Sequence, residues 1–290
     1  MKKKTNTDLI EKFLSHLKKD KEKNLSTQTL KTYENIGNSL PFNILTSQTT
    51  IIKKLKDLYD NPNTLALYLN MIILIRRFND DETDKLIKMR NSLRDAIIKE
   101  RKDNLTKFDD TLPTLKVINE ELDNLTGIQY IINYLIVNLG LRNQDMNLRM
   151  VKSFDDVDDN QIKVKGKKVL LNINDYKTEK SFGKKELEIN DSKFLNELKN
   201  MKLNQDDYLI TMKDGTRIKN IVTWNDKLKK LTINQLGQNK LVKIVIRDLL
   251  NNKQYDKLEK LSKSRGTSLQ VLLTSYNLHN GNKDEDEKKE

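Results

Sequence analysis

One block of alternating residues interrupts a chain whose apolar residues otherwise recur at helical spacing. Within residues 161–190, QIKVKGKKVLLNINDYKTEKSFGKKELEIN, apolar side chains occupy every second position in three runs: Ile162 and Val164; Val169, Leu171 and Ile173; Leu187 and Ile189. Because successive side chains of a strand point to opposite faces, each run predicts a short strand. Gly166 and Gly183 lie between the runs and predict turns. The block therefore predicts a small three-stranded antiparallel sheet in a mainly α (α+β) protein.

The first hundred residues carry only the helical pattern. Apolar residues recur three and four apart in segments that predict helices near 9–17, 26–36, 51–59, 64–78 and 84–99. After the alternating block, the same spacing predicts helices near 193–201, 219–231, 242–250, 256–262 and 268–278. Between the two halves, the stretch before Pro113 is charged and weakly periodic, as linkers are. We therefore predict a helical domain at 1–103, a linker at 104–113, a second domain at 114–280 and a disordered charged tail at 281–290.

The charge of the chain favours a polyanionic partner. Its 290 residues include 54 Lys and Arg against 42 Asp and Glu, a formal net charge of +12. Basic proteins of this kind most often bind nucleic acid. AT-rich coding also produces a chain rich in Lys, Asn and Ile. Charge alone therefore leaves two interpretations open, nucleic-acid binding and a merely solvated surface.

The scarcity of histidine and cysteine excludes several classes of site. With two histidines and no cysteine, thiolate catalysis, cysteine zinc sites and most histidine-based schemes are ruled out. Nucleotide-binding glycine loops are also missing, so we expect no metal and no cofactor. The longest apolar run, 65–75, is too short to span a bilayer, and the first residues lack a signal-peptide core. We expect a soluble protein of a reducing intracellular compartment with access to DNA, such as a bacterial or viral-factory cytoplasm or a nucleus, and not a secreted one.

Four side chains stand out. Arg142 follows an apolar helix and a glycine in NLGLRNQDMNLR, and Lys177 lies between the second and third predicted strands. Arg247 is a charge within the apolar run KIVIRDLL, where it must be compensated or functional. Tyr276 ends the helical pattern SLQVLLTSY and shares a face with three leucines. Taken singly, Tyr276 is a core residue and the cations are surface residues.

The order and settings of these residues resemble the tyrosine recombinase (phage integrase) family. GLRNQDMNL is similar to the family's first arginine box, with Asp145 three residues after Arg142. YKTEKSFGKK is similar to its Lys-Thr hairpin, and SRGTS, with Thr267 nine residues before Tyr276, to its small-Gly-His-Ser segment. LSTQTLKTYENI is similar to the start of the second helix in its core-binding domain. The resemblance covers nearly the whole chain and implies a helical core-binding domain followed by a catalytic domain.

Two positions depart from the family. The histidine usual three residues before the second arginine is Ile244, with Lys243 beside it, and the usual histidine or tryptophan of the last segment is Thr267. Thr267 would donate a hydrogen bond to a phosphate oxygen but is a poor base. Lys243 would lie near the phosphate, one residue out of register. The general base for Tyr276 is therefore unassigned, and we expect a slow enzyme.

The resemblance implies a reaction without added cofactor. Tyr276 would attack a DNA phosphodiester to give a 3′-phosphotyrosine. Arg142 and Arg247 would hold the non-bridging oxygens with forked donors. Lys177 would protonate the leaving 5′-oxygen, and Asp145 would orient Arg142. The implied activity is that of a site-specific DNA recombinase or integrase, as carried by viruses and other mobile elements.

The implied partner is double-stranded DNA, bound by a protein that self-associates as a dimer or tetramer on it, with no membrane and no small-molecule substrate. Candidate phosphate contacts are Lys53, Lys54, Arg76, Arg77, Lys180, Lys184, Lys263 and Arg265. Two alternatives stay open. One is a catalytically weakened relative that acts as a DNA-binding protein. The other is a basic helical module for RNA or protein, in which Tyr276 is a core residue.

Overall fold

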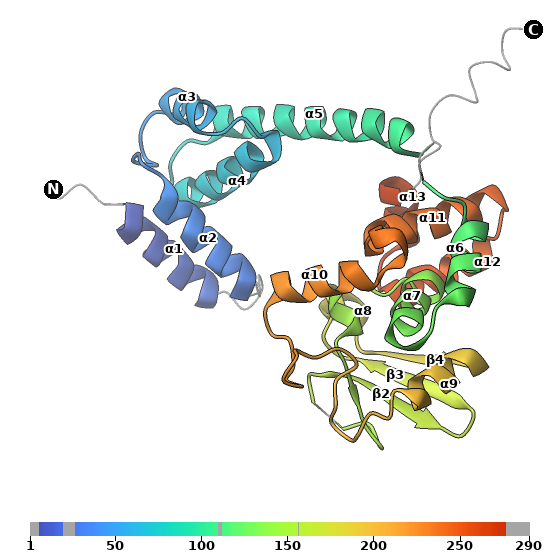
Figure 1. Ribbon diagram of the computed structural model, residues 1–290. Coiled ribbons are helices and arrows are strands. Elements are labelled where there is room, and N and C mark those ends of the chain that lie inside the picture. Colours follow the sequence, from blue (N-terminus) through green and yellow to red (C-terminus); the bar gives the residue numbers. More distant parts are fainter. Residues whose placement is uncertain (1–5, 20–26, 110–111, 156, 277–290) are drawn as a thin grey trace, which may run out of the picture. The chain divides into compact units, whose positions relative to one another are not determined.

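The structure is a computed structural model that describes residues 6–19, 27–109, 112–155 and 157–276 (Figure 1). It is mostly helical with a small four-stranded sheet, which confirms the predicted mainly α class. The chain divides into two compact units, Met1–Lys107 and Phe108–Glu290, and each is taken by itself below. Within the described residues, no helix combines the length and apolarity needed to cross a bilayer.

The described residues of the first unit form five helices. They are α1 (Asn6–Lys19), α2 (Thr27–Ser39), α3 (Gln48–Leu58), α4 (Pro62–Phe78) and α5 (Asp84–Asp109). Helix α4 is the most apolar of the five and packs against α1, α2 and α3, with Met71, Ile72 and Ile73 at most 1% exposed. Helices α1 and α2 approach closely at Gly37, where any Cβ would overlap the side chain of Ile10. The unit therefore has a core of its own around α4.

Helix α5 differs from its prediction. The pattern predicted an end near residue 99, but α5 continues to Asp109, inside the stretch predicted as a linker. The physical reason is that no glycine or proline occurs between Asp84 and Asp109 to stop the helix. Lysine, arginine, aspartate and asparagine side chains at its end weaken the apolar pattern without breaking the backbone hydrogen bonds.

The second unit is built around α7 (Gly127–Leu139). Helices α6 (Leu115–Asn124), α9 (Ser192–Asn200), α10 (Ile221–Leu231), α11 (Gln238–Asn251) and α12 (Tyr255–Arg265) all pack against it. Helix α13 (Leu269–Tyr276) packs against α11 and α12. The side chains of α7 are apolar nearly all round, and Ile131, Ile132, Leu135 and Ile136 have no exposed surface. A helix that is apolar on every side is stable only when neighbouring elements cover all of its faces.

The sheet has the order β1-β2-β3-β4. The three predicted strands are β2 (Asn160–Lys165), β3 (Lys168–Ile173) and β4 (Lys185–Ile189), paired antiparallel as predicted. A fourth strand, β1 (Leu148–Met150), pairs parallel to β2 and was not predicted. Three residues are too few for an alternating pattern, and β1 is held on its other side by Asp206–Leu209, far along the chain.

The β2–β3 and β3–β4 connections differ from each other. Gly166 makes the tight β2–β3 turn at φ +63°. The β3–β4 connection, predicted as a hairpin turn, instead contains the short helix α8 (Glu179–Phe182), which ends at Gly183 with φ +71°. This connection carries Lys177. The predicted tail at 281–290 lies outside the described residues.

Candidate functional site

Polar side chains gather around the end of α12, and most of them are buried. The group, called the Gly266 cluster here, comprises Arg142, Asp145, Tyr176, Thr178, Lys185, Ser264, Arg265 and Gly266. Asp145 is 0% exposed, Arg265 2% and Lys185 9%. Three charged side chains at such burial need partners, because a buried unpaired charge costs several kcal/mol.

Three consecutive carbonyls at the end of α12 accept hydrogen bonds from side chains. Lys185 Nζ donates to Ser264 O at 2.9 Å, Arg142 Nη1 to Arg265 O at 2.5 Å, and Thr178 Oγ1 to Gly266 O at 2.5 Å. The last carbonyls of a helix have no partner within it and lie at the negative end of its dipole. The cationic side chains therefore stabilise the end of α12, and the helix end in turn fixes the side chains.

Gly266 permits this arrangement in two ways. It ends α12 in the left-handed conformation, at φ +61°. A Cβ at this position would lie 2.6 Å from Tyr176 Cε2 and 3.4 Å from Lys185 Nζ. Only glycine allows the turn between α12 and α13 to approach Tyr176 so closely.

Within the Gly266 cluster, Asp145 connects Arg142 to Lys185. Its Oδ2 accepts the backbone N–H of Arg142 at 3.1 Å and lies 3.8 Å from Lys185 Nζ. Burial raises the pKa of the Asp145 carboxyl, against the opposing effect of Lys185 and, after it, of the Arg142 backbone hydrogen bond. Asp145 was expected to orient Arg142, and the described contact is to the main chain of Arg142.

Arg265 and Arg76 were predicted as phosphate contacts, and their burial contradicts this. Arg265 Nη1 donates to Gly140 O at 2.6 Å. Arg76, 6% exposed, donates to the carbonyls of Glu82, Ile44 and Thr46 at 3.0, 3.0 and 2.7 Å. Both guanidiniums are held by main-chain oxygens of their own unit. Arginine suits this role because its rigid fork of donors reaches several acceptors at once.

Lys177 is exposed and lies between two anchored residues. Tyr176 donates its hydroxyl to Gly183 O at 2.6 Å, and Thr178 donates to Gly266 O. The main chain at Lys177 is therefore fixed on both sides next to the α12–α13 turn, while its side chain extends into solvent.

Arg247 has its described contact elsewhere. It is half-buried on α11, and its Nη2 donates to Pro113 O at 2.8 Å, just before α6. On the same helix Ile244 has no exposed surface and Lys243 is half-buried. Arg142, by contrast, contacts the α12–α13 turn. The described contacts therefore bring Arg142, whose backbone N–H is held by Asp145, to this turn, and the described hydrogen bond of Arg247 is to Pro113 O.

The turn itself leads to the predicted nucleophile. Thr267 is 8% exposed; its backbone N–H donates to Ser262 O at 3.1 Å, and its carbonyl accepts from Ser262 Oγ at 2.6 Å. Helix α13 follows and ends at Tyr276. The side chain of Tyr276 lies outside the described residues.

The other predicted phosphate contacts are exposed. They are Lys53, Lys54 and Arg77 in the first unit and Lys180, Lys184 and Lys263 in the second. Lys263 forms an exposed ion pair with Glu259 at 2.7 Å. Arg90 and Arg94 did not stand out in the sequence: burial lowers the pKa of Arg90, and the charges of Arg94 and Arg77 add to the effect. Arg90 and Arg94 are one helical turn apart on α5, so the sequence spacing alone predicts that they lie on one face of the helix.

The burial of Lys185 was not predicted either, although Lys185 lies within the alternating pattern of β4. Lys185, Leu187 and Ile189 occupy every second position of β4, which places Lys185 on the same face as the two apolar residues. Its burial follows from strand period rather than from residue type. The predicted strand instead began at Leu187.

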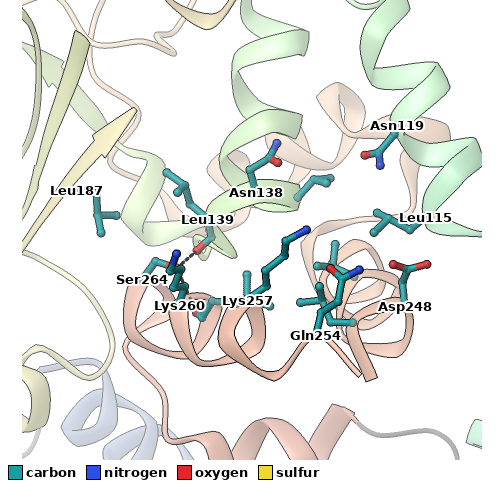
Figure 2. Close-up of a pocket in the computed structure, with 14 residues that line it drawn as sticks. Leu115, Asn119, Asn138, Leu139, Leu187, Asp248, Gln254, Lys257, Lys260 and Ser264 are labelled. Atoms are coloured by element: carbon teal, nitrogen blue, oxygen red, sulfur yellow. Dashed lines mark hydrogen bonds between the residues drawn. The ribbon is translucent and has the colours of Figure 1, made fainter. Parts of the chain in front are cut away.

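A groove of about 600 Å³ lies beside the cluster (Figure 2). Its floor is apolar, with Leu115, Leu139 and Leu187, and Lys257 and Lys260 line it as well. Ser264 belongs to both the groove lining and the Gly266 cluster: its Oγ donates to Leu139 O at 2.6 Å, while its carbonyl accepts from Lys185. Among the described residues, no three acidic or histidine side chains are placed to hold a metal ion.

Comparisons with known proteins find a likeness to solved structures but no match in sequence. No protein-family model matches the chain, and no curated protein matches it. Among solved structures, the crystal structure of XerA recombinase aligns over 94% of this chain and 94% of its own, with 13% identity and a TM-score of 0.38. The proposals below therefore depend on the residues of this chain.

Proposed function

We propose that the chain is a site-specific DNA recombinase or integrase, which cleaves and rejoins DNA through a tyrosine nucleophile. The observation that carries the proposal is the contact of Arg142, whose backbone N–H is held by Asp145, with the α12–α13 turn, because α13 leads directly from that turn to Tyr276. These residues come from separate parts of the sequence, and the resemblance to tyrosine recombinases requires them to act on one phosphate. The basic surface and net charge of +12 suit a DNA partner.

The proposed chemistry has two balanced steps. The hydroxyl of Tyr276 releases its proton to solvent water as its oxygen attacks the phosphorus, the bond from phosphorus to the 5′-oxygen breaks, and Lys177 gives the leaving oxygen a proton. Arg142 and Arg247 neutralise the charge that develops on the non-bridging oxygens. Rejoining reverses the step, because a 5′-hydroxyl attacks the phosphotyrosine and Tyr276 leaves. The phosphotyrosine conserves the bond energy, so strand rejoining needs no nucleotide cofactor.

Removal of the proton from Tyr276 is expected to limit the rate, because no general base is assigned to it. Ile244 is buried among apolar side chains and has no group to offer, and Thr267 is a weak acid–base group. Loss of one general acid–base group slows a reaction by roughly 10²–10⁴. We therefore expect cleavage to take minutes to hours rather than seconds, a rate that serves a protein acting once per DNA site.

A covalent trap tests the proposal. The substrate is a pool of duplexes with randomised sequence, each nicked a few nucleotides 3′ of the randomised positions so that the released piece diffuses away. Wild-type protein is expected to form a protein–DNA adduct that survives denaturation, and Tyr276→Phe to form none. Tyr255→Phe is the matched control, since Tyr255 is an exposed tyrosine at the start of α12. An adduct that persists in Tyr276→Phe would overturn the assignment.

A second candidate function is DNA binding without turnover. The burial of Ile244 at a position where the family places a histidine favours it. The same pool separates the two functions: binding to the duplexes with no adduct over a day identifies a weakened relative. If the protein retains no duplex at low salt, both functions are wrong, and the basic surface is then only a solvated one.

A further inference from the structure

Lys185 is a buried lysine for which the proposed reaction has no role. Its side chain is 8% exposed at the start of β4. Burying an ammonium group carries a desolvation penalty of several kcal/mol, and most lysines avoid it by extending into water. A lysine in this position is therefore held by specific contacts.

The contacts of Lys185 join three separate segments. Its Nζ donates to Ser264 O at 2.9 Å, lies 3.8 Å from Asp145 Oδ2 and stands 3.7 Å from the centroid of the Tyr176 ring. Ser264 is at the end of α12, Asp145 is in the 3₁₀ turn η1 (Gln144–Met146), and Tyr176 is in the β3–α8 connection. One ammonium group thus contacts all three by hydrogen bond, ion pair and cation–π contact.

Each of these segments carries a residue of the proposed reaction. Asp145 accepts the backbone N–H of Arg142, Tyr176 directly precedes Lys177, and Ser264 precedes the turn into α13. We infer that Lys185 is a positioning residue of the proposed reaction, whose ammonium group holds Arg142, Lys177 and the α12–α13 turn in one arrangement. The inference rests on the proposed function for its effect on catalysis, but the arrangement itself is a property of the protein without DNA.

The positive charge of Lys185 compensates the buried carboxylate of Asp145. The carboxylate has no exposed surface, and among the described residues its Oδ1 has no hydrogen-bond partner. Lys185 is the largest cationic influence on its pKa. When Lys185 loses its proton, the backbone N–H of Arg142 is the close partner that remains to Asp145 among the described residues. A neutral Lys185 therefore weakens the link between β4 and Arg142.

The arrangement should respond to pH near neutrality. The groups that face Lys185 are Asp145, Arg142, Arg265 and Tyr176. Burial lowers the pKa of Lys185 to about 8; Asp145 opposes this, and the charges of Arg142 and Arg265 add to it. Both arginines stay charged throughout, and burial raises the pKa of Tyr176. Lys185 is therefore protonated below about pH 8, and the arrangement loosens as the pH rises through that value.

A titration of the DNA-free protein tests the arrangement without any assumption about function. Nuclear magnetic resonance of ¹⁵N-labelled lysine side chains should show one ammonium group, absent in Lys185→Gln, with a midpoint near pH 8. In Asp145→Asn the midpoint should fall, because the carboxylate raises the pKa of Lys185. A Lys185 midpoint that is the same in wild type and in Asp145→Asn would overturn the inference, because the ammonium group would then not be held against Asp145.

Covalent adduct formation tests the catalytic effect between pH 6.5 and 9.5. Relative to the general rise caused by ionisation of tyrosine, wild type should fall above pH 8 to a level about tenfold lower. Lys185→Gln retains a donor for Ser264 O but no charge, and should be about tenfold slower at pH 7 with no break near pH 8. Lys185→Arg, charged at every pH, should remove the break while keeping adduct formation.

The controls separate the possible failures. Lys168→Gln removes an exposed lysine of the same sheet, paired with Glu188 at 2.7 Å, and should follow wild type. If Lys185→Gln follows wild type, or fails to fold while Lys185→Arg keeps the break, Lys185 does not position the site through its charge. If wild type forms no adduct at any pH, the proposed function falls, and the titration still decides the arrangement.

Discussion

Arg76 shows how a charge can be structural at the scale of one residue. Its guanidinium joins the end of α4 to the carbonyls of Ile44 and Thr46, and to Glu82 just before α5. Arg77, its neighbour on α4, is exposed. Replacement of a buried donor leaves several buried acceptors unsatisfied, and each such acceptor costs roughly 1–3 kcal/mol. Removal of Arg76 should therefore destabilise the fold, whereas removal of the adjacent Arg77 should leave its stability nearly unchanged.

We predict that Arg76→Met lowers the free energy of unfolding by about 2–4 kcal/mol. Arg77→Met should change it by no more than about 0.5 kcal/mol, since it removes an exposed side chain. Urea denaturation followed by circular dichroism at 222 nm measures both. For DNA affinity the order reverses: among variants that remain folded, Arg77→Met should bind duplex DNA more weakly. Equal losses of stability in the two variants would contradict the assignment of Arg76 to the core.

At the scale of elements, Gly266 couples the end of α12 to the sheet. A side chain at this position meets two separate penalties, the left-handed φ of +61° and contact with Tyr176. Gly215 has φ +80° and nothing within 4 Å of an added Cβ, so it carries the first penalty alone. A comparison of alanine substitutions at Gly215 and Gly266 therefore separates the cost of backbone strain from the cost of the steric contact.

We predict that Gly215→Ala costs about 1–2 kcal/mol and that Gly266→Ala costs at least about 1 kcal/mol more. Thermal and urea unfolding of the two variants supply the comparison. In folded Gly266→Ala, the shifted turn should also slow adduct formation at unchanged DNA affinity. Equal destabilisation by the two substitutions would mean that the α12–α13 turn yields easily and does not fix the site.

Sequence reasoning worked for elements whose signal is local. Strands β2 to β4 follow from their alternation, and the helices follow from apolar spacing. It failed where the determining contact is distant, as for β1, which depends on pairing with Asp206–Leu209. It also failed for Lys185 and Arg265, because residue type suggested a surface position whereas strand and helix period placed both on buried faces. Arg142 and Asp145 were proposed through their resemblance to a family motif, and the contact of Arg142 with the end of α12 required the structure.

At the scale of the whole molecule, the two units have separate cores. The core around α4 and the core around α7 share no residue. Each unit can therefore fold with its own apolar contacts, and each carries its own exposed basic residues. If both units contact DNA as proposed, their combined affinity should exceed that of either alone, because the second surface then binds at a high effective concentration of DNA.

We predict that a fragment of residues 108–290 folds cooperatively on its own and unfolds within a few degrees of the same unit in the full chain. Trp224, the single tryptophan, is buried in this unit and reports its unfolding by fluorescence. The fragment lacks Lys53, Lys54 and Arg77, so its affinity for duplex DNA should be lower and should fall less steeply with salt, by about one unit of logarithmic slope for each phosphate that these side chains neutralise in the full chain. An identical salt slope for fragment and full chain would show that the first unit does not contact DNA.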